Sequence, residues 1–505
     1  MSPTISRRVL LKNAVANVAS GTSAALLAVV LPPILLKYLS RDIYAVWALI
    51  LQVGAYTGLL NFGLQVAVGR FVAHYETTGE TDRRDALVST AWVSLALAGL
   101  VAALGMIAVS IAFPHLFPKI PAQLRGEAQV AMAWVGLSMA IGLPFSVFMG
   151  VFVGRQRYEV PGLIQIGSRL LTGVVLVWIA FHRGTLVSMA QAFAGINLLT
   201  YGAQYVAHRL WAASCRIHPG RAALTAAKEL WEYSFSLSVW NVAMLMVTGL
   251  DLVIVGRVDF KAVPAYAIAT GLVTFVAGLQ NAVFNVLIPA GAVLGAEEDA
   301  ARLQRMLLNA TRYGVLLLLT SSLPLLLGGE FLLRHYVGIE LATITLPLLR
   351  LLVIGNLIRL TATPYAALLI ATGQQRVVLI TPFVEGSINL VLSIVLGLRI
   401  GAAGVAIGTV IGAMVGIICN LFYNFPRTRL ITVDIKIYLI HGLLVPLSIA
   451  MPLLFLYWIA HGLYIGLQLR LILIFLGAML SLIMTWMLIL TKEDRHTIIM
   501  KLSGG

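Results

Sequence analysis

The sequence predicts an all-α, polytopic membrane protein with about fourteen transmembrane helices. Its composition predicts this class, because 60% of the 505 residues are hydrophobic and only 11% are charged. The mean hydropathy of +0.94 agrees and excludes a soluble globular core. Apolar stretches also recur along the whole chain, each reaching the roughly 18 to 20 residues that a helix needs to cross about 30 Å of hydrocarbon.

The expected spans follow one another with mostly short loops. The first is preceded by Arg7, Arg8 and Lys12, as a secretory signal would be, but its apolar stretch continues to Leu36 and is too long for one. It is therefore expected to be an uncleaved helix. In order, the predicted spans are residues 13–36, 44–68, 86–113, 128–152, 158–181, 186–207, 233–256, 264–288, 307–327, 342–370, 377–398, 403–423, 437–460 and 464–490.

The second span, residues 44–68, carries polar groups but no formal charge. Read as one continuous helix, it places Asn61 and Gln65 one turn apart on a shared face. Arg70 follows where a guanidinium can reach the membrane interface. This helix is therefore expected to face protein or water on one side.

The net charge of +15 is concentrated in alternate loops. If the N-terminus is cytoplasmic, most Lys and Arg residues lie in cytoplasmic loops, which is the positive-inside pattern and places both termini in the cytoplasm. A nucleic-acid partner is not expected, because the chain has no soluble basic block. Cys215 and Cys419 are far apart and lack metal-type spacing, so neither a disulfide nor a zinc site is predicted.

An internal repeat organises the chain. Residues 154–175 read GRQRYEVPGLIQIGSRLLTGVV and residues 373–394 read GQQRVVLITPFVEGSINLVLSI, aligned at a constant offset of 219 residues. An even number of helices per copy gives parallel repeats, which favour a transporter with a site in a cleft between two lobes. The predicted divisions are an N-terminal six-helix lobe (1–207), a cytoplasmic linker (208–232), a C-terminal six-helix lobe (233–424), and two further helices with a cytoplasmic tail (425–505).

Four stretches carry a resemblance to a known family. They are YLSRDIYAVWALI (38–50), LLNFGLQVAVGRFVAHY (59–75), residues 264–314 with a Tyr-Ala-x-Ala entry, and residues 371–412 with a Gly-Ala-x-Gly-x-Ala helix start. Together they resemble the Wzx-like polysaccharide flippases of the multidrug, oligosaccharidyl-lipid and polysaccharide exporter superfamily. The resemblance covers the first twelve spans.

The resemblance implies flipping of an undecaprenyl-pyrophosphate-linked oligosaccharide from the cytoplasmic to the periplasmic leaflet of a bacterial inner membrane, by alternating access, for cell-surface polysaccharide synthesis. It implies membrane lipids as surroundings, and a polysaccharide polymerase and chain-length machinery as partners. The physical problem is that a sugar headgroup must cross hydrocarbon, where each unpaired polar group costs several kcal/mol. A hydrated cleft that is open sideways for the lipid tail solves it.

Three other functions are alternatives to oligosaccharide flipping. Lipid II flipping shares the lipid pyrophosphate chemistry and suits fourteen spans. A multidrug cation exporter of the same superfamily typically needs intramembrane acids in its N-terminal lobe, and this lobe has none. A membrane polysaccharide polymerase would need a carboxylate pair or a large outer loop, and neither is evident, so no catalytic residue and no enzyme activity are expected.

Polar residues inside the spans are candidates for lining the cleft. Several form i, i+4 pairs on one helix face and could bind sugar hydroxyls, although a structural hydrogen bond between helices is the commoner role of such a residue. These candidates are Asn13, Asn17, Asn61, Gln65, Gln165, Asn281 and Asn285.

Charged residues inside spans are stronger indicators of a functional site than neutral polar ones, because each costs about 2.5–3.5 kcal/mol at the centre of a helix. Arg169 lies near the middle of its span and, with Arg70, is a candidate ligand for pyrophosphate or an acidic sugar; water and local helix groups are the alternative partners of Arg169. Asp251 and Arg350 both lie toward the periplasmic face and could pair.

Arg359 and Glu385 flank a cytoplasmic turn at similar depth, and an antiparallel hairpin is expected to bring them into an ion pair. Arg350 lies about 180° around the helix from Arg359. Glu385, Asn389 and Ser393 form one polar stripe that could hold a coupling cation. The candidate coupling ion is a proton or sodium, and no other cofactor or metal is expected.

Overall fold

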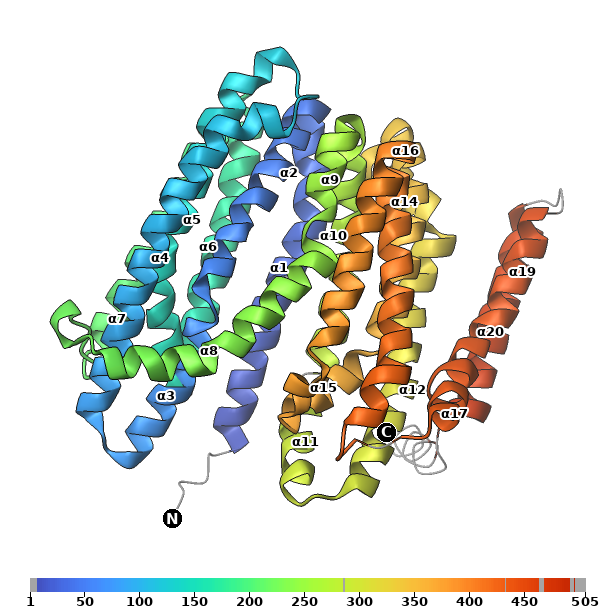
Figure 1. Ribbon diagram of the computed structural model, residues 1–505. Coiled ribbons are helices and arrows are strands. Elements are labelled where there is room, and N and C mark those ends of the chain that lie inside the picture. Colours follow the sequence, from blue (N-terminus) through green and yellow to red (C-terminus); the bar gives the residue numbers. More distant parts are fainter. Residues whose placement is uncertain (1–6, 285–286, 432, 463–466, 491–494, 496–505) are drawn as a thin grey trace. The chain divides into compact units, whose positions relative to one another are not determined.

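The computed structural model describes residues 7–284, 287–431, 433–462, 467–490 and 495. Every regular element in these ranges is a helix, so the predicted all-α class is confirmed (Figure 1). Twelve helical segments within them are long and apolar enough to cross a membrane. The chain is a multi-pass membrane protein.

The helices of the first half are α1 (Arg7–Tyr38), α2 (Arg41–Ala55), α3 (Leu64–Thr78), α4 (Thr81–Leu116), α5 (Ala122–Gly154), α6 (Glu159–Phe181), α7 (Leu186–Trp211), α8 (Leu224–Met244) and α9 (Asp251–Val258). Those of the second half are α10 (Val263–Phe284), α11 (Leu287–Ala296), α12 (Ala300–Leu327), α13 (Gly329–Val337), α14 (Ile339–Leu360), α15 (Thr363–Ala371), α16 (Ile380–Cys419), α17 (Ile435–Ile437), α18 (Val445–Ser448), α19 (Ala450–Gly462) and α20 (Leu467–Met484).

Two compact units contain these helices. The first holds Met1–Gly278, Tyr336–Leu348 and Gly386–Thr409, and the second holds Leu279–His335, Leu349–Glu385 and Val410–Gly505. In the first unit α4 packs along α5, and α5 also packs against α3 and α7. In the second unit α12 packs against α15 and α18, and α19 packs along α20. The lobe boundaries expected from the repeat stay a prediction.

The predicted count of about fourteen spans is compatible with the twelve segments. The apolar segment Ile380–Arg427 contains two of the predicted spans, because α16 leaves helical geometry at Ile400 (φ −129°) and Gly401 (φ 65°). The chain reverses there, since a Cβ on Gly408 would lie 2.7 Å from the backbone nitrogen of Ser393. The sixth predicted span is present as the 26-residue helix α7, which is not among the twelve segments apolar enough to be counted.

The second predicted span is broken, so the expectation of one continuous helix was wrong. Helix α2 ends at Ala55, a 3₁₀ turn covers Tyr56–Asn61, and Phe62 (φ 50°) and Gly63 (φ 71°) are left-handed before α3 begins. Asn61 Oδ1 accepts a hydrogen bond from the backbone N–H of Gln65 at 3.3 Å. Asn61 therefore satisfies the start of α3 instead of sharing a helical face with Gln65.

Small residues let α5 approach α3 closely. A Cβ on Gly150 would lie 2.7 Å from the carbonyl oxygen of Gln65, and one on Gly154 would lie 2.6 Å from that of Gly69. The four-residue spacing puts both glycines on one face of α5, and small residues at such spacing allow close backbone contact between membrane helices. This contact fixes the position of α3 in the first unit.

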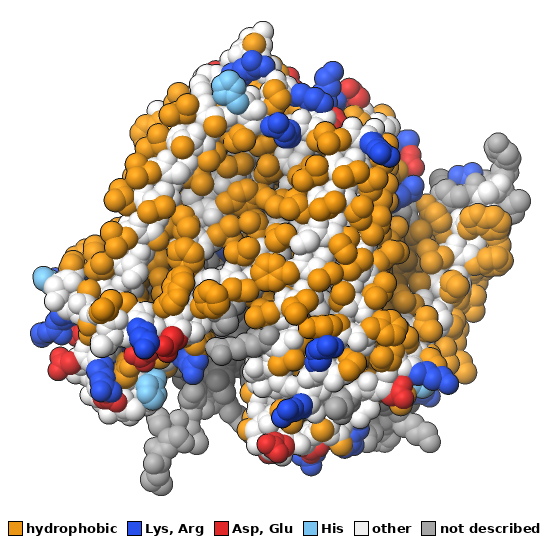
Figure 2. Space-filling model, in the orientation of Figure 1, with side chains coloured by type: hydrophobic (Ala, Val, Ile, Leu, Met, Phe, Trp, Pro, Cys, Tyr) orange, Lys and Arg blue, Asp and Glu red, His pale blue; other side chains and the backbone are white. Residues whose placement is uncertain are grey.

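Large hydrophobic side chains are exposed along the helices, and charged side chains gather at helix ends in both units (Figure 2). Exposed apolar surface on this scale is expected of helices that face lipid. At one such end of the first unit, Arg41 and Glu340 form a bidentate pair, with N–O distances of 2.9 and 2.8 Å.

The linker after α7 folds back on α4. The backbone N–H of His218 donates to Ser89 Oγ at 3.1 Å, and that of Ala223 donates to Thr90 Oγ1 at 3.0 Å. Helix α8, in green, then begins across the end of the first unit near α3 and α4 before it turns toward α9 (Figure 1). Tyr75 on α3 donates to Glu229 on α8 at 2.9 Å.

Candidate functional site

A buried carboxylate is at the centre of one polar cluster in the first unit. Asp251 is the first residue of α9 and only 8% exposed. Thr409 Oγ1 donates to its Oδ2 at 2.8 Å, and the Tyr266 hydroxyl donates to the same oxygen at 3.3 Å. Asn389 Nδ2 lies 3.5 Å from Oδ1. The "Asp251 cluster", defined as Asp251, Tyr266, Asn389, Ser393 and Thr409, thus joins α9, α10 and both arms of α16.

Local helix distortion supplies the cluster with backbone oxygens. The residues before Asp251, Leu245–Gly249, form a π-helical turn, a geometry that often occurs at functional sites. Asn389 Nδ2 donates to the carbonyl of Val247 at 2.8 Å, and Ser393 Oγ donates to Asn389 Oδ1 at 3.2 Å. Carboxylate, hydroxyl, amide and carbonyl oxygens are ligands that hard cations prefer.

The same π turn contacts α2. The carbonyl of Gly249 accepts hydrogen bonds from Gln52 Nε2 at 2.9 Å and from the Tyr56 hydroxyl. Two polar side chains of a predicted N-terminal span therefore end at the turn that precedes Asp251. This connection gives the N-terminal helices a direct physical contact with the segment that carries the cluster.

Arg359 and Glu385 form a second polar centre, in the second unit. Arg359 Nε donates to Glu385 Oε1 at 2.7 Å, which is the ion pair that the hairpin geometry predicts. The two side chains are 17% and 11% exposed. Among the described residues, Arg359 Nη2 has no hydrogen-bond partner. The predicted stripe of Glu385, Asn389 and Ser393 is therefore divided, since only its last two members take part in the Asp251 cluster.

The expected pairing of Asp251 with Arg350 is not among the contacts described for either residue. Asp251 hydrogen-bonds within its cluster, whereas the side chain of Arg350 on α14 is exposed. Arg359, nine positions further along the same helix, is half-buried. This difference in exposure agrees with the opposite faces that helical geometry assigns to the two arginines.

Arg169 on α6 has neutral side-chain partners. Its Nη1 donates to Ser23 Oγ on α1 at 3.1 Å, and its Nη2 donates to Gln165 Oε1, one turn earlier, at 3.3 Å. Neither partner carries a charge that would offset the cation. Gln165 thus positions the guanidinium, and a ligand role for Arg169 stays a prediction.

The remaining candidates lie apart from these centres. Arg70 is exposed and stacks on the Tyr233 ring at 4.6 Å. Asn61 Nδ2 donates to Ser146 Oγ at 2.8 Å, which is a contact between helices. Asn281 is exposed, and Gln65 is half-buried. Asn285 and the side chains of Asn13 and Asn17 lie outside the described residues.

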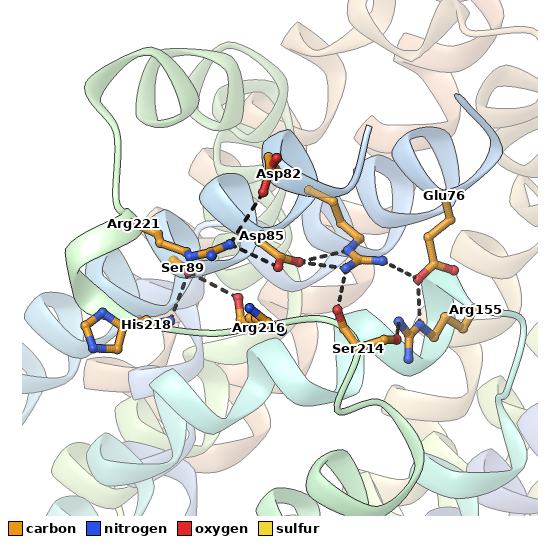
Figure 3. A network of polar contacts seen from close by, with 10 residues as sticks. Glu76, Asp82, Asp85, Ser89, Arg155, Ser214, Arg216, His218 and Arg221 are labelled. Carbon is orange, nitrogen blue, oxygen red and sulfur yellow. Dashed lines mark hydrogen bonds and ion pairs between the residues drawn. The ribbon is translucent and has the colours of Figure 1, made fainter. Parts of the chain in front are cut away.

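Sequence reasoning missed a charge network that holds the linker, drawn in Figure 3. The guanidinium of Arg84 lies 2.8 Å from Asp85 and 3.2 Å from Glu76, and donates to the carbonyl of Ser214 at 2.6 Å. Arg155 donates to the same Glu76 at 2.7 Å. The sequence did show acidic residues on both sides of a basic turn within residues 76–85. It could not show their partners, because these come from distant segments of the chain.

Tyr266 and Thr409 were also missed. Single hydroxyl residues are common in membrane helices, and their sequence positions carry no sign that they face an acid. Their role becomes visible only when packing fixes the rotation of α10 and α16 about their axes.

Outside the membrane-spanning helices, burial raises the pKa of the Cys215 thiol to about 12, which leaves this linker cysteine uncharged.

The fold is that of membrane transporters. No protein-family model and no curated protein matches the chain. Among solved structures, it is similar to the lipid II flippase MurJ in an inward closed conformation, with a TM-score of 0.72 and 16% identity over 94% of this chain and 98% of that one. It is similar to an inward-facing multidrug resistance MATE transporter of the MOP superfamily, with a TM-score of 0.67 and 15% identity over 83% of this chain and 95% of that one.

A third similar structure is a MOP superfamily transporter from Pyrococcus furiosus Vc1, described as having a binding pocket of reversed polarity. Its TM-score is 0.52 at 16% identity, over 83% of this chain and 99% of that one. All three are transporters or flippases. The likeness establishes the shared fold.

Proposed function

We propose that this protein flips an oligosaccharide linked to undecaprenyl pyrophosphate from the cytoplasmic to the periplasmic leaflet of a bacterial inner membrane, for cell-surface polysaccharide synthesis. The observation that carries this proposal is the fold shared with a lipid II flippase across 94% of this chain and 98% of that one. The sequence resemblance to Wzx-like flippases supports the choice of an oligosaccharide as the headgroup. A polymerase and chain-length proteins are the proposed partners.

Flipping of lipid II itself is the second candidate. The likeness to MurJ extends over 94% of this chain, against 83% for the similar MATE transporter. Both candidates handle a polyprenyl pyrophosphate, so they place the same demands on an anion-binding arginine and on a path for the lipid tail. They differ in the headgroup that the protein meets.

We also propose that the Asp251 cluster couples transport to an ion gradient. The groups that could bind an ion there are one carboxylate, three hydroxyls, an amide and the carbonyls of a distorted helix, a set that suits sodium or, through protonation of Asp251, a proton. The π turn that supplies the carbonyls also contacts α2 through Gly249. Binding at Asp251 therefore has a route by which it can bias the position of an N-terminal helix.

Proteoliposomes with the purified chain test the function. The lipid-linked oligosaccharide carries a fluorophore on its sugar, and an impermeant reductant bleaches only the label in the outer leaflet. We expect the protein to expose inner-leaflet label that protein-free vesicles protect. A labelled phospholipid is the control, and equal bleaching of that lipid would indicate scrambling and contradict the proposal.

Two further substrates separate the alternatives. Labelled lipid II in the same vesicles should be flipped more slowly than the oligosaccharide lipid, and flipping of lipid II alone would establish the second candidate. A lipophilic cation with a pH-sensitive readout tests the exporter. Transport of the cation without either lipid would overturn both flippase proposals.

A further inference from the structure

A cavity of about 810 Å³ opens in the first unit. None of its lining residues belongs to the Asp251 cluster. It lies between α4, α5, α7 and the linker that follows α7, and we call it the linker cavity. Its size falls within the range of pockets that enclose small ligands. None of the roles proposed above uses it.

One side of the linker cavity is an aromatic wall. Phe145 stacks on Tyr201 with ring centroids 5.4 Å apart, and Phe148 meets Tyr205 edge to face at 5.9 Å. Trp92 of α4 also lines the cavity. These rings present apolar surface that a hydrocarbon chain can cover.

The cavity opens toward the lipid-facing surface of the helices. Ile141 and Leu198 line it, yet they are 45% and 48% exposed. Tyr205 is 47% exposed in the same way. A chain from the surrounding bilayer can therefore lie along the groove that α5 and α7 line without leaving hydrocarbon.

The other side of the cavity is basic. Arg209, Arg216, His218 and Arg221 line it, and Figure 3 shows the last three on the linker beside Asp85. Arg221 is already paired with Asp85 at 3.3 Å. Among the described residues, no partner forms an ion pair or hydrogen bond with the guanidinium of Arg209 or Arg216. Two cations therefore remain available to an anion at the rim.

A buried polar atom in the lining gives a second, independent sign of a ligand. His208 lines the cavity and is 5% exposed, and its Nε2 has no hydrogen-bond partner among the described residues. Buried polar groups normally find a partner, and a group without one suggests a ligand or water that completes the site.

We propose that the linker cavity binds a phospholipid with an acidic headgroup, its phosphate at Arg209 and Arg216 and one acyl chain along the aromatic wall. Basic pockets between membrane helices on the cytoplasmic side suit anionic lipid headgroups, and the positive-inside pattern places this linker on that side. The cavity combines the two features that such a lipid needs, an apolar slot open to hydrocarbon and a cationic rim.

The test uses the full-length protein purified in detergent and titrated with phosphatidylglycerol or phosphatidylcholine, with bound lipid counted by native mass spectrometry. We expect tighter binding of phosphatidylglycerol. Changing Arg209→Gln and Arg216→Gln together should weaken it about tenfold to thirtyfold, given the usual contribution of a basic residue near anionic lipid. The matched control, Arg305→Gln with Arg427→Gln, removes the same charge from exposed residues elsewhere and should leave binding unchanged.

A second variant tests the apolar slot without touching the charges. Gly202 lines the cavity, and a Cβ there would meet no atom within 4 Å, so the side chain of Gly202→Leu begins in open space at the slot. It should reduce phosphatidylglycerol binding. Gly195→Leu on the same helix also enters open space but is not among the lining residues, and it should not.

Four outcomes would overturn the proposal. Equal binding of the two phospholipids would remove the role of the arginines. Loss of binding in neither the arginine variant nor Gly202→Leu would place the lipid elsewhere. Undecaprenyl phosphate displacing phosphatidylglycerol at lower concentration would identify the occupant as the carrier lipid, whereas inorganic phosphate displacing it as effectively would show that the site reads a phosphate alone.

Discussion

The Cα of Gly416 lies directly against the carboxylate of Glu385, so that a Cβ at position 416 would be 2.3 Å from Glu385 Oε2. Glu385 is also the ion-pair partner of Arg359. The two arms of α16 thus enclose an acid that is paired with Arg359 and has no spare volume between its second oxygen and Gly416. Glycine is required at 416 for a reason of space, since its backbone is ordinary helix.

Gly416→Ala should therefore destabilise the protein. The added methyl group forces a shift of the Glu385 carboxylate, which is held by Arg359, and overpacking of this kind typically costs about 1–3 kcal/mol. The measurement is the thermal unfolding midpoint of the detergent-purified protein. Gly195→Ala is the matched control, because a Cβ there meets nothing within 4 Å. Equal midpoints for the two variants would contradict the tight contact.

The Arg359–Glu385 pair should behave as a coupled unit in a double-mutant cycle. Removing one partner, with Arg359→Met or Glu385→Gln, leaves the other buried without compensation, which usually costs about 3–5 kcal/mol. The double variant should be less destabilised than the sum of the single ones. Additive losses in the unfolding free energy would show that the two groups do not interact. Exchanging the two charges is a poorer test, because Gly416 leaves no room for a guanidinium at 385.

Asp251→Asn should abolish the dependence of flipping on an ion gradient. The carboxylate of Asp251 is the one charged group of the cluster. The amide that replaces it can neither bind a proton nor neutralise sodium. Thr409→Val should weaken ion affinity about tenfold to a hundredfold, whereas Thr409→Ser keeps the hydroxyl and should stay close to the unaltered protein. Flipping rates in proteoliposomes against sodium concentration and pH measure this. An unchanged ion dependence in Asp251→Asn would place the coupling site elsewhere.

Substitutions of Arg169 distinguish a ligand role of this residue from a structural one. If its guanidinium binds the pyrophosphate or an acidic sugar, Arg169→Lys should keep part of the transport, and Arg169→Gln should lose most of it at normal membrane abundance. Ser23→Ala removes one hydrogen-bond partner while keeping the charge, and it should have a small effect. Full transport by Arg169→Gln would end the ligand role.

The linker should protect Cys215 from thiol reagents. With a pKa of about 12, roughly one thiol in ten thousand is ionised at pH 8, and the side chain is fully buried. In a Cys419→Ser variant, maleimide at neutral pH should label the denatured protein and leave the folded protein largely unlabelled. Rapid labelling of the folded protein at pH 7.5 would show that the linker opens.

The membrane spans and one ion pair could be predicted from sequence, because simple helix geometry determines both. Spans follow from length and hydropathy, and the Arg359–Glu385 pair follows because a tight antiparallel hairpin fixes the relative depth of two residues. The break at Phe62 and Gly63 was hidden, since the run stays apolar across it. The partners of Asp251 were also beyond reach, because they depend on how helices rotate about their axes.

The pair between Arg41 and Glu340 has a consequence for the medium that the protein works in. The two side chains are 44% and 79% exposed, and exposed pairs contribute only about 0.2–1 kcal/mol. Both residues lie in the first compact unit, although residue 41 belongs to the predicted N-terminal lobe and residue 340 to the predicted C-terminal one. If the proposed alternating access moves these lobes apart, breaking this pair would cost little. Because mobile ions screen such pairs over a Debye length of about 10 Å at 0.1 M, the attraction between these two side chains weakens as the ionic strength outside the membrane rises.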